Sequence, residues 1–138
     1  MAYISQDEKK TLSCGIKAVL NKYSMKGSIK VSNHSTLVVN IKSGKLDILE
    51  NWFQKATEYG DKNRYGEIIK KPESIEVNEY WIDSTYTDEV KEFINELLQA
   101  MKGDKWFDKS DTQTDYFNIA WYNRINVGNW DKPYQVEM

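Results

Sequence analysis

The first helix is predicted by a cap and by the spacing of the apolar residues that follow it. Ser5 and Glu8 have the S-x-x-E spacing of a capping box, in which each side chain accepts a hydrogen bond from the other residue's backbone N–H. Apolar residues then recur with the period of a helix that buries one face: Leu12, Ile16, Val19, Leu20 and Tyr23. Gly15 costs about 1 kcal/mol relative to Ala, so we expect a neighbouring element to pack closely there. We expect the helix to end at 25–27, Met-Lys-Gly.

The same spacing predicts two further helices. One covers residues 46–59, with Gly60 as its C-terminal cap. The other follows Thr87, a residue type that caps helices, and ends at Gly103. Its apolar stripe is the strongest periodic signal in the chain and consists of Val90, Phe93, Ile94, Leu97, Leu98 and Met101.

Alternation of apolar and polar residues predicts four strands. Two of them flank the short polar segment 33–35, and this arrangement predicts a β-hairpin in which Asn33 tolerates a positive φ. A third strand is expected over residues 74–82. The fourth is expected to extend from residue 116 to residue 127, and its regular alternation indicates one face on the core and one face near water.

The predicted elements follow one another in the order α-β-β-α-β-α-β. We therefore predict an α+β fold in which a mainly antiparallel four-stranded sheet has its helices packed on one face. The length suits a single domain over residues 1–138. The charged segment 61–73 has no clean period, and we predict that it is a mobile loop.

Charge and residue counts exclude several classes of site. The 19 Lys and Arg against 21 Asp and Glu give a net charge of −2, which is not the charge of a phosphate-binding surface. One His and one Cys hold no zinc cluster, and the chain has neither a glycine-rich phosphate loop nor an HExxH helix. A lone Cys14 fits a reducing cytoplasm, and no apolar run approaches the ~18 residues of a membrane span. With no pattern of a secretory signal at the start, we expect a cytoplasmic protein with no cofactor and no membrane partner.

His34 is the side chain that normally titrates between pH 5 and 8, which makes it a candidate general base beside Asn33 and Ser35. A nucleophile and its base must touch, however, and adjacent side chains in a tight hairpin diverge. Turn chemistry accounts for all three residue types without a substrate. We therefore favour a structural role, and we treat the three as candidates for binding and not for catalysis.

Carboxylates are concentrated in the predicted loop before the last strand. Asp108, Asp111 and Asp115 are interleaved with hydroxyl residues such as Ser110, and hard cations prefer several oxygen ligands. The spacing differs from that of an EF-hand loop, because it lacks the D-x-D-x-D-G pattern and the final bidentate Glu. Asp and Ser are also ordinary turn and cap residues. We predict no metal site, and these four residues remain candidates for binding a ligand.

The outer face of the last strand carries aromatic and cationic side chains. Tyr116, Tyr122 and Arg124 alternate with the predicted core positions. Such a face can stack nucleic-acid bases or anchor a protein interface. A helix can also cover it, so that its side chains join the core with their polar tips in water. We favour the interpretation in which a helix covers this face. Contact with another protein comes second, and contact with nucleic acid comes third.

Several stretches of the sequence resemble a family of small domains of phages and other mobile elements, the large polyvalent protein associated domain. The most distinctive stretch is 31–41, V-S-N-H-S-T-L-V-V-N-I. The others, all in the second half, are 78–81, 108–111, 115–117, 121–122, 128 and 130–134. This resemblance implies a mobile-element protein that counters host defences, and it implies no catalytic residue.

A weaker likeness concerns the hairpin alone. The runs 32–35 and 37–42, S-N-H-S and L-V-V-N-I-K, are similar to part of a small phage inhibitor of type II CRISPR nucleases. That inhibitor has a very basic N-terminal arm, which this chain lacks. The likeness therefore implies no shared contact with nucleic acid.

We expect a non-enzymatic accessory protein of a phage or mobile element that binds a host macromolecule, foremost a defence protein, as an anti-CRISPR inhibitor does. A first alternative is a small-ligand or metal-dependent enzyme centred on the loop from Asp108 to Asp115 and on His34, which requires these two segments to meet. A second alternative is a module that binds single-stranded nucleic acid through the aromatic and cationic side chains of the last strand.

Overall fold

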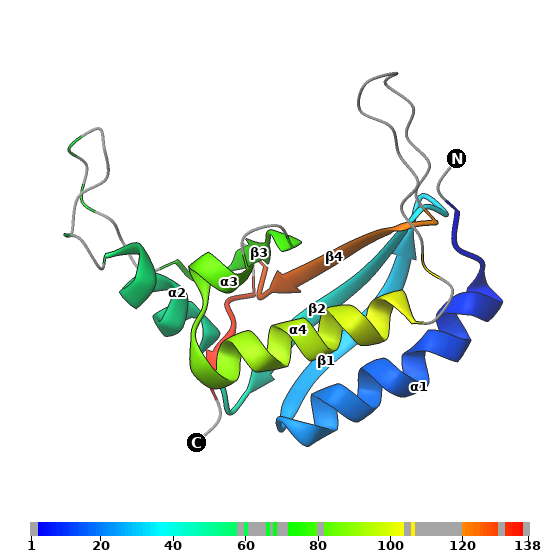
Figure 1. Ribbon diagram of the computed structural model, residues 1–138, viewed down its shortest axis with the longest axis horizontal. Helices are drawn as coiled ribbons and strands as arrows, with labels where there is room; N and C mark the ends of the chain where they lie inside the picture. The colour runs from blue at the N-terminus through cyan, green and yellow to red at the C-terminus, as the bar shows by residue number, and fades with distance from the viewer. Residues whose placement is uncertain are drawn as a thin grey trace.

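The computed structural model of the chain describes residues 3–57, 60, 66, 68, 72–79, 82–103, 106, 120–129 and 132–136. Figure 1 shows how the described helices and strands are arranged. In chain order they are α1 (Gln6–Lys22), β1 (Met25–Ser32), β2 (Thr36–Gly44), α2 (Ile48–Ala56), β3 (Ile75–Val77), α3 (Ile82–Thr85), α4 (Asp88–Lys102), β4 (Tyr122–Val127) and β5 (Gln135–Val136).

Five strands form one mixed sheet, which confirms the α+β prediction but differs from the expected four-stranded, mainly antiparallel sheet. β1 pairs with β2, and β3 with β4, in antiparallel directions. β4 instead runs parallel to β2, from the pair Thr36–Tyr122 to the pair Ile41–Val127, and the short β5 is also parallel to β2. The chain crosses over through helices between β2 and β4, and such a crossover brings the next strand back in the same direction.

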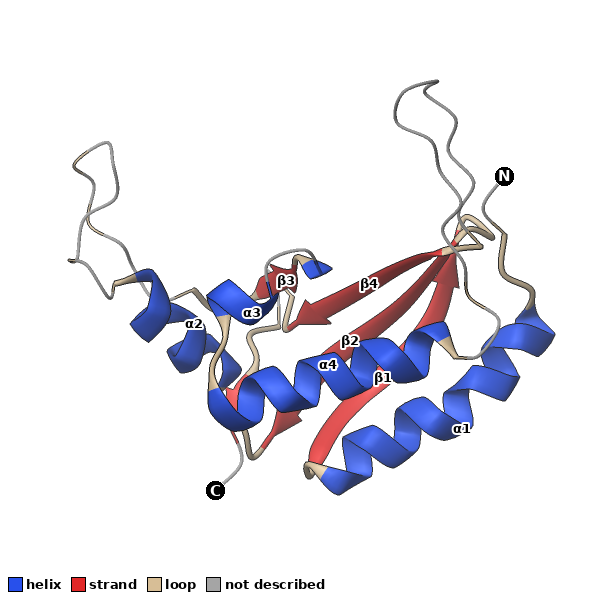
Figure 2. Ribbon diagram, viewed as in Figure 1, coloured by secondary structure: helices blue, strands red, loops and turns tan. Residues whose placement is uncertain are grey.

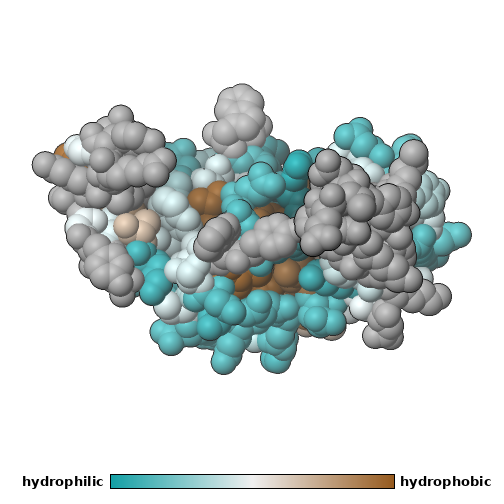
Figure 3. Space-filling view, turned by 45° about the horizontal axis from the view of Figure 1, so that its top comes forward, coloured by the Kyte–Doolittle hydropathy of each residue, from teal (hydrophilic) through white to brown (hydrophobic). Residues whose placement is uncertain are grey.

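The long helices α1 and α4 lie on the same face of the sheet, whereas α2 and α3 lie at one end of it (Figures 1 and 2). Figure 3 shows hydrophobic surface in the middle of the view, with hydrophilic surface below it. None of the described helices is both long enough and apolar enough to cross a membrane. The fully buried side chains are Ile4, Ile16, Leu37, Val38, Val39, Ile41, Ile48, Phe93, Ile94, Leu97, Met101 and Val127.

The capping box at the start of α1 is confirmed. The N–H of Glu8 donates to the Ser5 hydroxyl at 3.0 Å, and the N–H of Ser5 donates to the Glu8 carboxylate at 3.5 Å. The helix ends earlier than expected, because Ser24 takes a left-handed φ of 56° and the chain then enters β1. Met25 belongs to that strand and is buried, 4% exposed, beside Gly44. Burial of its side chain in the core thus explains why Met25 belongs to β1 and not to the helix.

Gly15 faces α4, but α4 does not pack there as closely as we had expected, and glycine is not required. A Cβ built on Gly15 lies 3.8 Å from the Cβ of Ala100, which is an ordinary van der Waals distance. α4 therefore passes close to α1 at this point and still leaves space for a methyl group.

The hairpin between β1 and β2 is confirmed. Asn33 and His34 have φ values of 53° and 59°, and the N–H of Ser35 donates to the Ser32 carbonyl at 3.2 Å. Two central residues with positive φ match the right-handed twist of the flanking strands. The pair Ser32–Thr36 then closes the ladder.

The second predicted helix corresponds to α2 and is shorter than predicted. The third predicted helix corresponds to α4 and is close to its predicted bounds. α2 begins after Asp47, whose side chain accepts a hydrogen bond from the N–H of Glu50 at 3.1 Å. It is capped by Thr57 and not by Gly60, because the N–H of Thr57 donates to the Phe53 carbonyl at 3.0 Å. α4 follows Thr87 and ends at Gly103, as expected.

The second half of the chain departs furthest from the expected strands. The strand predicted over 74–82 covers only Ile75–Val77, and Ile82 already begins α3. The last strand is described as Tyr122–Val127, and residues 116–119 of its predicted range lie outside the described residues. Of the predicted loop 61–73, the structure describes only residues 66, 68, 72 and 73. The described strand residues still alternate between core and surface, from buried Trp121 to buried Val127.

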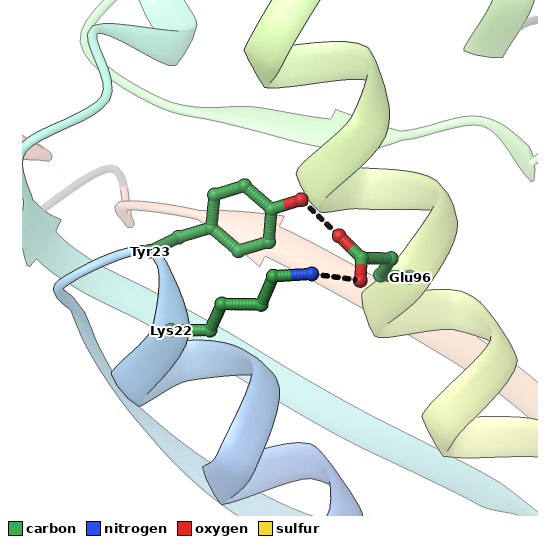
Figure 4. Close-up of polar contacts among 3 residues, drawn as sticks. All are labelled: Lys22, Tyr23 and Glu96. Atoms are coloured by element: carbon green, nitrogen blue, oxygen red, sulfur yellow. Dashed lines mark hydrogen bonds and ion pairs between the residues drawn. The ribbon is translucent and has the colours of Figure 1, made fainter.

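A polar cluster joins the end of α1 to α4 (Figure 4). Lys22 Nζ lies 2.7 Å from one Glu96 carboxylate oxygen, and the Tyr23 hydroxyl donates to the other. The pKa of Tyr23 is raised to about 12, mainly by the hydrogen bond to Glu96 and to a smaller extent by burial. Hydrogen bonds from Lys22 and Tyr23 lower the pKa of Glu96. The Tyr23 ring also packs edge-on against Phe93, with 5.2 Å between ring centroids, so the cluster fastens the two helices together.

Candidate binding surface

The side of the sheet that faces away from α1 and α4 is the candidate binding surface, which we call the outer face. Within the described ranges no helix lies over it, and Figure 2 shows α1 and α4 on the opposite side. Strand alternation and the pairing register assign its residues. They are Ser28, Lys30 and Ser32 of β1, Thr36, Val38 and Asn40 of β2, Tyr122, Arg124 and Asn126 of β4, and Glu76 of β3.

A row across the middle of the outer face combines an apolar centre with a cation on either side. The register pairs Val38 with Lys30 on one side and with Arg124 on the other. Val38 is only 2% exposed, although it lies outside the main core cluster. Long cationic side chains bury their methylene stems along apolar surface while their charged ends stay in water. The row therefore presents two cationic side chains on either side of a buried valine, and the valine itself adds almost no accessible apolar surface.

Tyr122 and Arg124 are exposed on this face. Tyr122 is 47% exposed, and the Arg124 side chain is 51% exposed. Arg124 Nε lies 3.1 Å from the Glu76 carboxylate, which holds the guanidinium in place on the strand next to it. The interpretation in which a helix covers these two side chains is therefore wrong.

The rest of the outer face is polar. Asn126 Nδ2 donates to Asn40 Oδ1 at 2.9 Å across the parallel pair β2 and β4. The remaining residues, Ser28, Ser32 and Thr36, are short hydroxyl side chains. Such side chains form hydrogen bonds with little loss of conformational entropy. The face thus has polar side chains around the row of Lys30, Val38 and Arg124, two of which are joined by a hydrogen bond.

The hairpin residues lie at one end of the outer face. The N–H of Tyr122 donates to the Ser35 carbonyl at 2.8 Å, and the N–H of Ile4 donates to the His34 carbonyl at 2.7 Å. Asn33 and His34 are exposed at the tip. These contacts bring the hairpin candidates next to Tyr122, which joins two of the predicted groups into one surface.

The other predicted candidates are not placed. Tyr116 and the loop residues Asp108, Ser110, Asp111 and Asp115 lie outside the described residues. Whether this loop meets His34 therefore stays a prediction. Across the ranges that the structure describes, no group of three or more His, Cys, Asp or Glu side chains is arranged to hold a metal ion.

The described residues form clefts that were not predicted from the sequence, and two of these clefts include residues at or just before the start of β4. One, of about 350 Å³, lies between the first turn of α1 and the end of α4 and is lined by residues that include Asp7, Lys102 and Trp121. The other, of about 420 Å³, lies at the end of β3 and includes Glu79 and Asn123. Strand alternation marked Asn123 as an inward polar residue on an otherwise apolar side, which was the signal available for the second cleft.

The chain matches no protein-family model, no curated protein and no solved structure. The resemblance to the phage domain family rests on its quoted stretches of sequence. The geometry of the outer face and of the clefts is what bears on function.

Proposed function

We propose that the chain is a non-enzymatic accessory protein that binds another protein through the outer face of its sheet. The observation that carries this proposal is the exposed ring of Tyr122 together with the exposed cations Lys30 and Arg124, which flank the buried Val38. Tyr and Arg dominate the energy of protein interfaces, because each buries a large area and keeps a polar group for a hydrogen bond. The exposed ring of Tyr122, with polar side chains around it, also agrees with the usual anatomy of such interfaces, in which an apolar centre has a polar rim.

Charge favours a protein partner over nucleic acid. A nucleic-acid surface uses cations that are free to neutralise phosphates. Arg124, in contrast, is 3.1 Å from Glu76, so an approaching phosphate meets a carboxylate beside the guanidinium. The net charge of −2 adds no general attraction for a polyanion. A protein with its own mixed charges suits this pair better.

The sequence resemblance supports a phage or mobile-element context. In that context the partner is a host protein in the cytoplasm, foremost a component of a defence system. Binding of this kind requires no catalytic group on the chain.

The test is the recovery of a partner by the tagged full chain and by two double variants. Tyr122→Ala with Arg124→Ala removes the two exposed anchors of the outer face. Lys17→Ala with Asn95→Ala removes two exposed side chains from α1 and α4 and is the matched control. We expect the chain and the control to recover one dominant partner in a fixed ratio. The outer-face variant should bind that partner about 30-fold or more weakly, because interface hot spots contribute about 2 kcal/mol or more.

Two results would contradict the proposal. One is a partner that binds the outer-face variant as tightly as the chain itself, which would place the interface elsewhere. The other is the recovery of nucleic acid with an affinity that falls steeply with salt, which would favour the single-strand alternative. Oligonucleotide titrations at low salt separate these cases, and we expect them to show no binding.

A further inference from the structure

The first strand of the hairpin lies at the edge of the sheet. The strand order is β1-β2-β4-β3, with β5 also beside β2, so β1 pairs with β2 and with no other strand of the described chain. An edge strand presents unpaired N–H and C=O groups, with which a strand of another chain can pair. The free side of β1, which we call the open edge, is therefore a candidate site for such pairing.

The hydrogen bonds of β2 show which residues of β1 face the open edge. The Ile41 carbonyl accepts a hydrogen bond at 2.8 Å from Gly128, just after β4, so Ile41 points its backbone groups toward β4. Val39 and Leu37 do the same, because the direction of the backbone groups alternates along a strand. The β1 partners of these residues are Gly27, Ile29 and Val31. Such pairs point their N–H and C=O groups away from each other, so the three β1 residues point theirs to the open edge.

These backbone groups have no other hydrogen-bond partner in the part of the chain that the structure describes. Gly27 is exposed, and Ile29 and Val31 are half-buried against the core. Backbone groups without a partner in the fold need hydrogen bonds from water or from another chain. An incoming strand can replace water at all three residues and extend the sheet.

Lysines border the open edge on both sides. Lys30 of β1 is exposed on the outer face. On the other side of the sheet α1 runs along β1, and α4 lies further toward β4 (Figure 1). Ile16 is buried in the core and Gly15 faces α4, so Lys17 lies on the side of α1 away from α4. Lys10 is two turns earlier on the same side, and both of these lysines are exposed above the open edge.

No carboxylate of the two elements offsets these lysines along the edge. β1 contains no Asp or Glu, and both acidic residues of α1 lie in its first turn. The open edge is therefore positively charged, although the chain as a whole has a net charge of −2. Opposite charges on neighbouring strands stabilise pairing, and like charges oppose it. Lysines on an edge strand also keep copies of that strand apart, so the edge favours an acidic strand over a second copy of this chain.

The two faces of the incoming strand require different side chains. On the outer face they lie beside Lys30, so carboxylates are favoured there. On the opposite face they lie beside Ile29 and Val31, which are apolar and half-buried, so apolar side chains are favoured there. Since side chains alternate between the faces of a strand, the segment that fits alternates acidic and apolar residues.

We propose that the open edge of β1 pairs with an extended segment of a partner protein in which acidic and apolar residues alternate. Pairing uses the backbone of β1 and needs neither Tyr122 nor Arg124, so it is a second mode of binding beside the proposed use of the outer face. Lys30 belongs to both surfaces, and an added strand continues the outer face past it.

The test is calorimetric titration of the full chain with capped seven-residue peptides. The acidic probe is T-E-V-E-V-E-T, and the basic probe is T-K-V-K-V-K-T. We expect the acidic peptide to bind with a dissociation constant below about 1 mM and the basic peptide to bind about 10-fold or more weakly. The peptides represent no particular partner, so their failure to bind contradicts the open edge alone. The recovery experiment with Tyr122→Ala and Arg124→Ala, in contrast, tests the outer face alone.

Backbone methylation separates strand pairing from simple attraction between charges. Alternate N–H groups of an extended peptide point to the same side. One analogue of the acidic probe carries N-methyl groups on its valines, and the other carries them on its glutamates. The valine N–H groups face β1 in an antiparallel pair, and the glutamate N–H groups face it in a parallel pair. We expect one analogue to bind about 10-fold or more weakly, and the other to stay within about 3-fold of the parent peptide.

A charge-reversed variant checks the role of Lys30. Lys30→Glu should bind the acidic peptide about 5-fold or more weakly, and the basic peptide more tightly, than the unchanged chain does. Lys132→Glu changes the net charge equally at an exposed position after β4 and is the control. The proposal is overturned if the acidic peptide does not bind at millimolar concentration, if the two peptides bind equally, if the two methylated analogues bind equally, or if Lys30→Glu binds like the control. A dimer of the chain alone that the acidic peptide dissociates would assign the open edge to a second copy and would also overturn it.

Discussion

Single hydroxyl groups make long-range contacts in this protein, and the Tyr23 hydroxyl is one whose effect depends on pH. It donates to Glu96, and its pKa is raised from 10.0 to about 12 in the folded chain. The protonated hydroxyl therefore stabilises the fold fully below about pH 10, and this contribution is lost as the pH rises from 10 through 12. The pKa of Glu96 is lowered, so its own contribution is lost at the acid end, as the pH falls through that lowered pKa.

Tyr23→Phe should remove the loss of stability between pH 10 and 12, while the aromatic ring still packs against Phe93. We expect the free energy of unfolding to be higher for the chain than for the variant at pH 7–9. That difference should shrink steadily above pH 10. Urea unfolding of both proteins between pH 7 and 11.5 measures it, because most other titrating groups are common to the two and cancel. Tyr3→Phe, at a position 56% exposed, is the control and should show a flat difference; a flat difference for Tyr23→Phe would contradict the assignment.

At the residue scale, the sequence located part of the candidate surface. Alternation along the last strand put Tyr122 and Arg124 on one side and Ile125 on the other, because a strand repeats every two residues. It did not show that this side is uncovered, since helix placement depends on contacts between distant segments. Nor did it show that Glu79 and Asn123, which are far apart in the chain, line one cleft at the end of the β3–β4 ladder.

At the scale of elements, α4 is capped by a residue from another helix. Thr87 stands at its N-terminus but makes no side-chain capping bond of its own. Asn51 of α2 instead pairs with it twice: its Nδ2 donates to the Thr87 hydroxyl at 2.9 Å, and its Oδ1 accepts from the Thr87 N–H at 3.1 Å. The start of α4 is thereby tied to α2.

Asn51→Ala should therefore lower the free energy of unfolding by about 1–3 kcal/mol, since it removes two partly buried hydrogen bonds. Asn95→Ala, on the exposed side of α4, should change it by less than about 0.5 kcal/mol. Urea unfolding followed by circular dichroism compares the two. If the two variants were equally stable, the link between α2 and α4 would not contribute to stability.

Local signals predicted the helices and the hairpin better than the sheet. The capping box of Ser5 and the apolar stripe of α4 act within one element, so the sequence shows them directly. The parallel pairing of β2 with β4 is decided by a long crossover, and no local pattern distinguishes it from an antiparallel pair. The strand predicted over 74–82 failed because Glu79 interrupts the alternation and the chain soon turns into α3.

At the scale of the whole molecule, the end of the described chain closes the fold through Tyr134. β4 and β5 both lie beside β2, one after the other, and Gly128, which follows β4, has a left-handed φ of 73°. A Cβ on Gly128 would lie 2.6 Å from the Tyr134 backbone nitrogen, so this position requires glycine. The Tyr134 ring is buried, its hydroxyl donates to the Leu46 carbonyl at 2.5 Å, and its N–H donates to the Glu73 carbonyl at 3.1 Å. One residue thus joins the approaches to α2 and β3, through its side chain and its backbone respectively.

Tyr134→Ala should lower the free energy of unfolding by about 3–5 kcal/mol, because it empties an aromatic site in the core. Tyr134→Phe should cost about 1 kcal/mol, the usual loss for one hydrogen bond. Val136→Ala, two residues further and 42% exposed, is the control and should have little effect. Urea unfolding followed by both tryptophan fluorescence and circular dichroism makes the comparison. If Tyr134→Ala lowered the free energy of unfolding by less than about 1 kcal/mol, the C-terminal segment would not contribute to the stability of the core. A loss of the expected size, with the same transition by fluorescence and by circular dichroism, would show that this segment unfolds cooperatively with the rest of the domain.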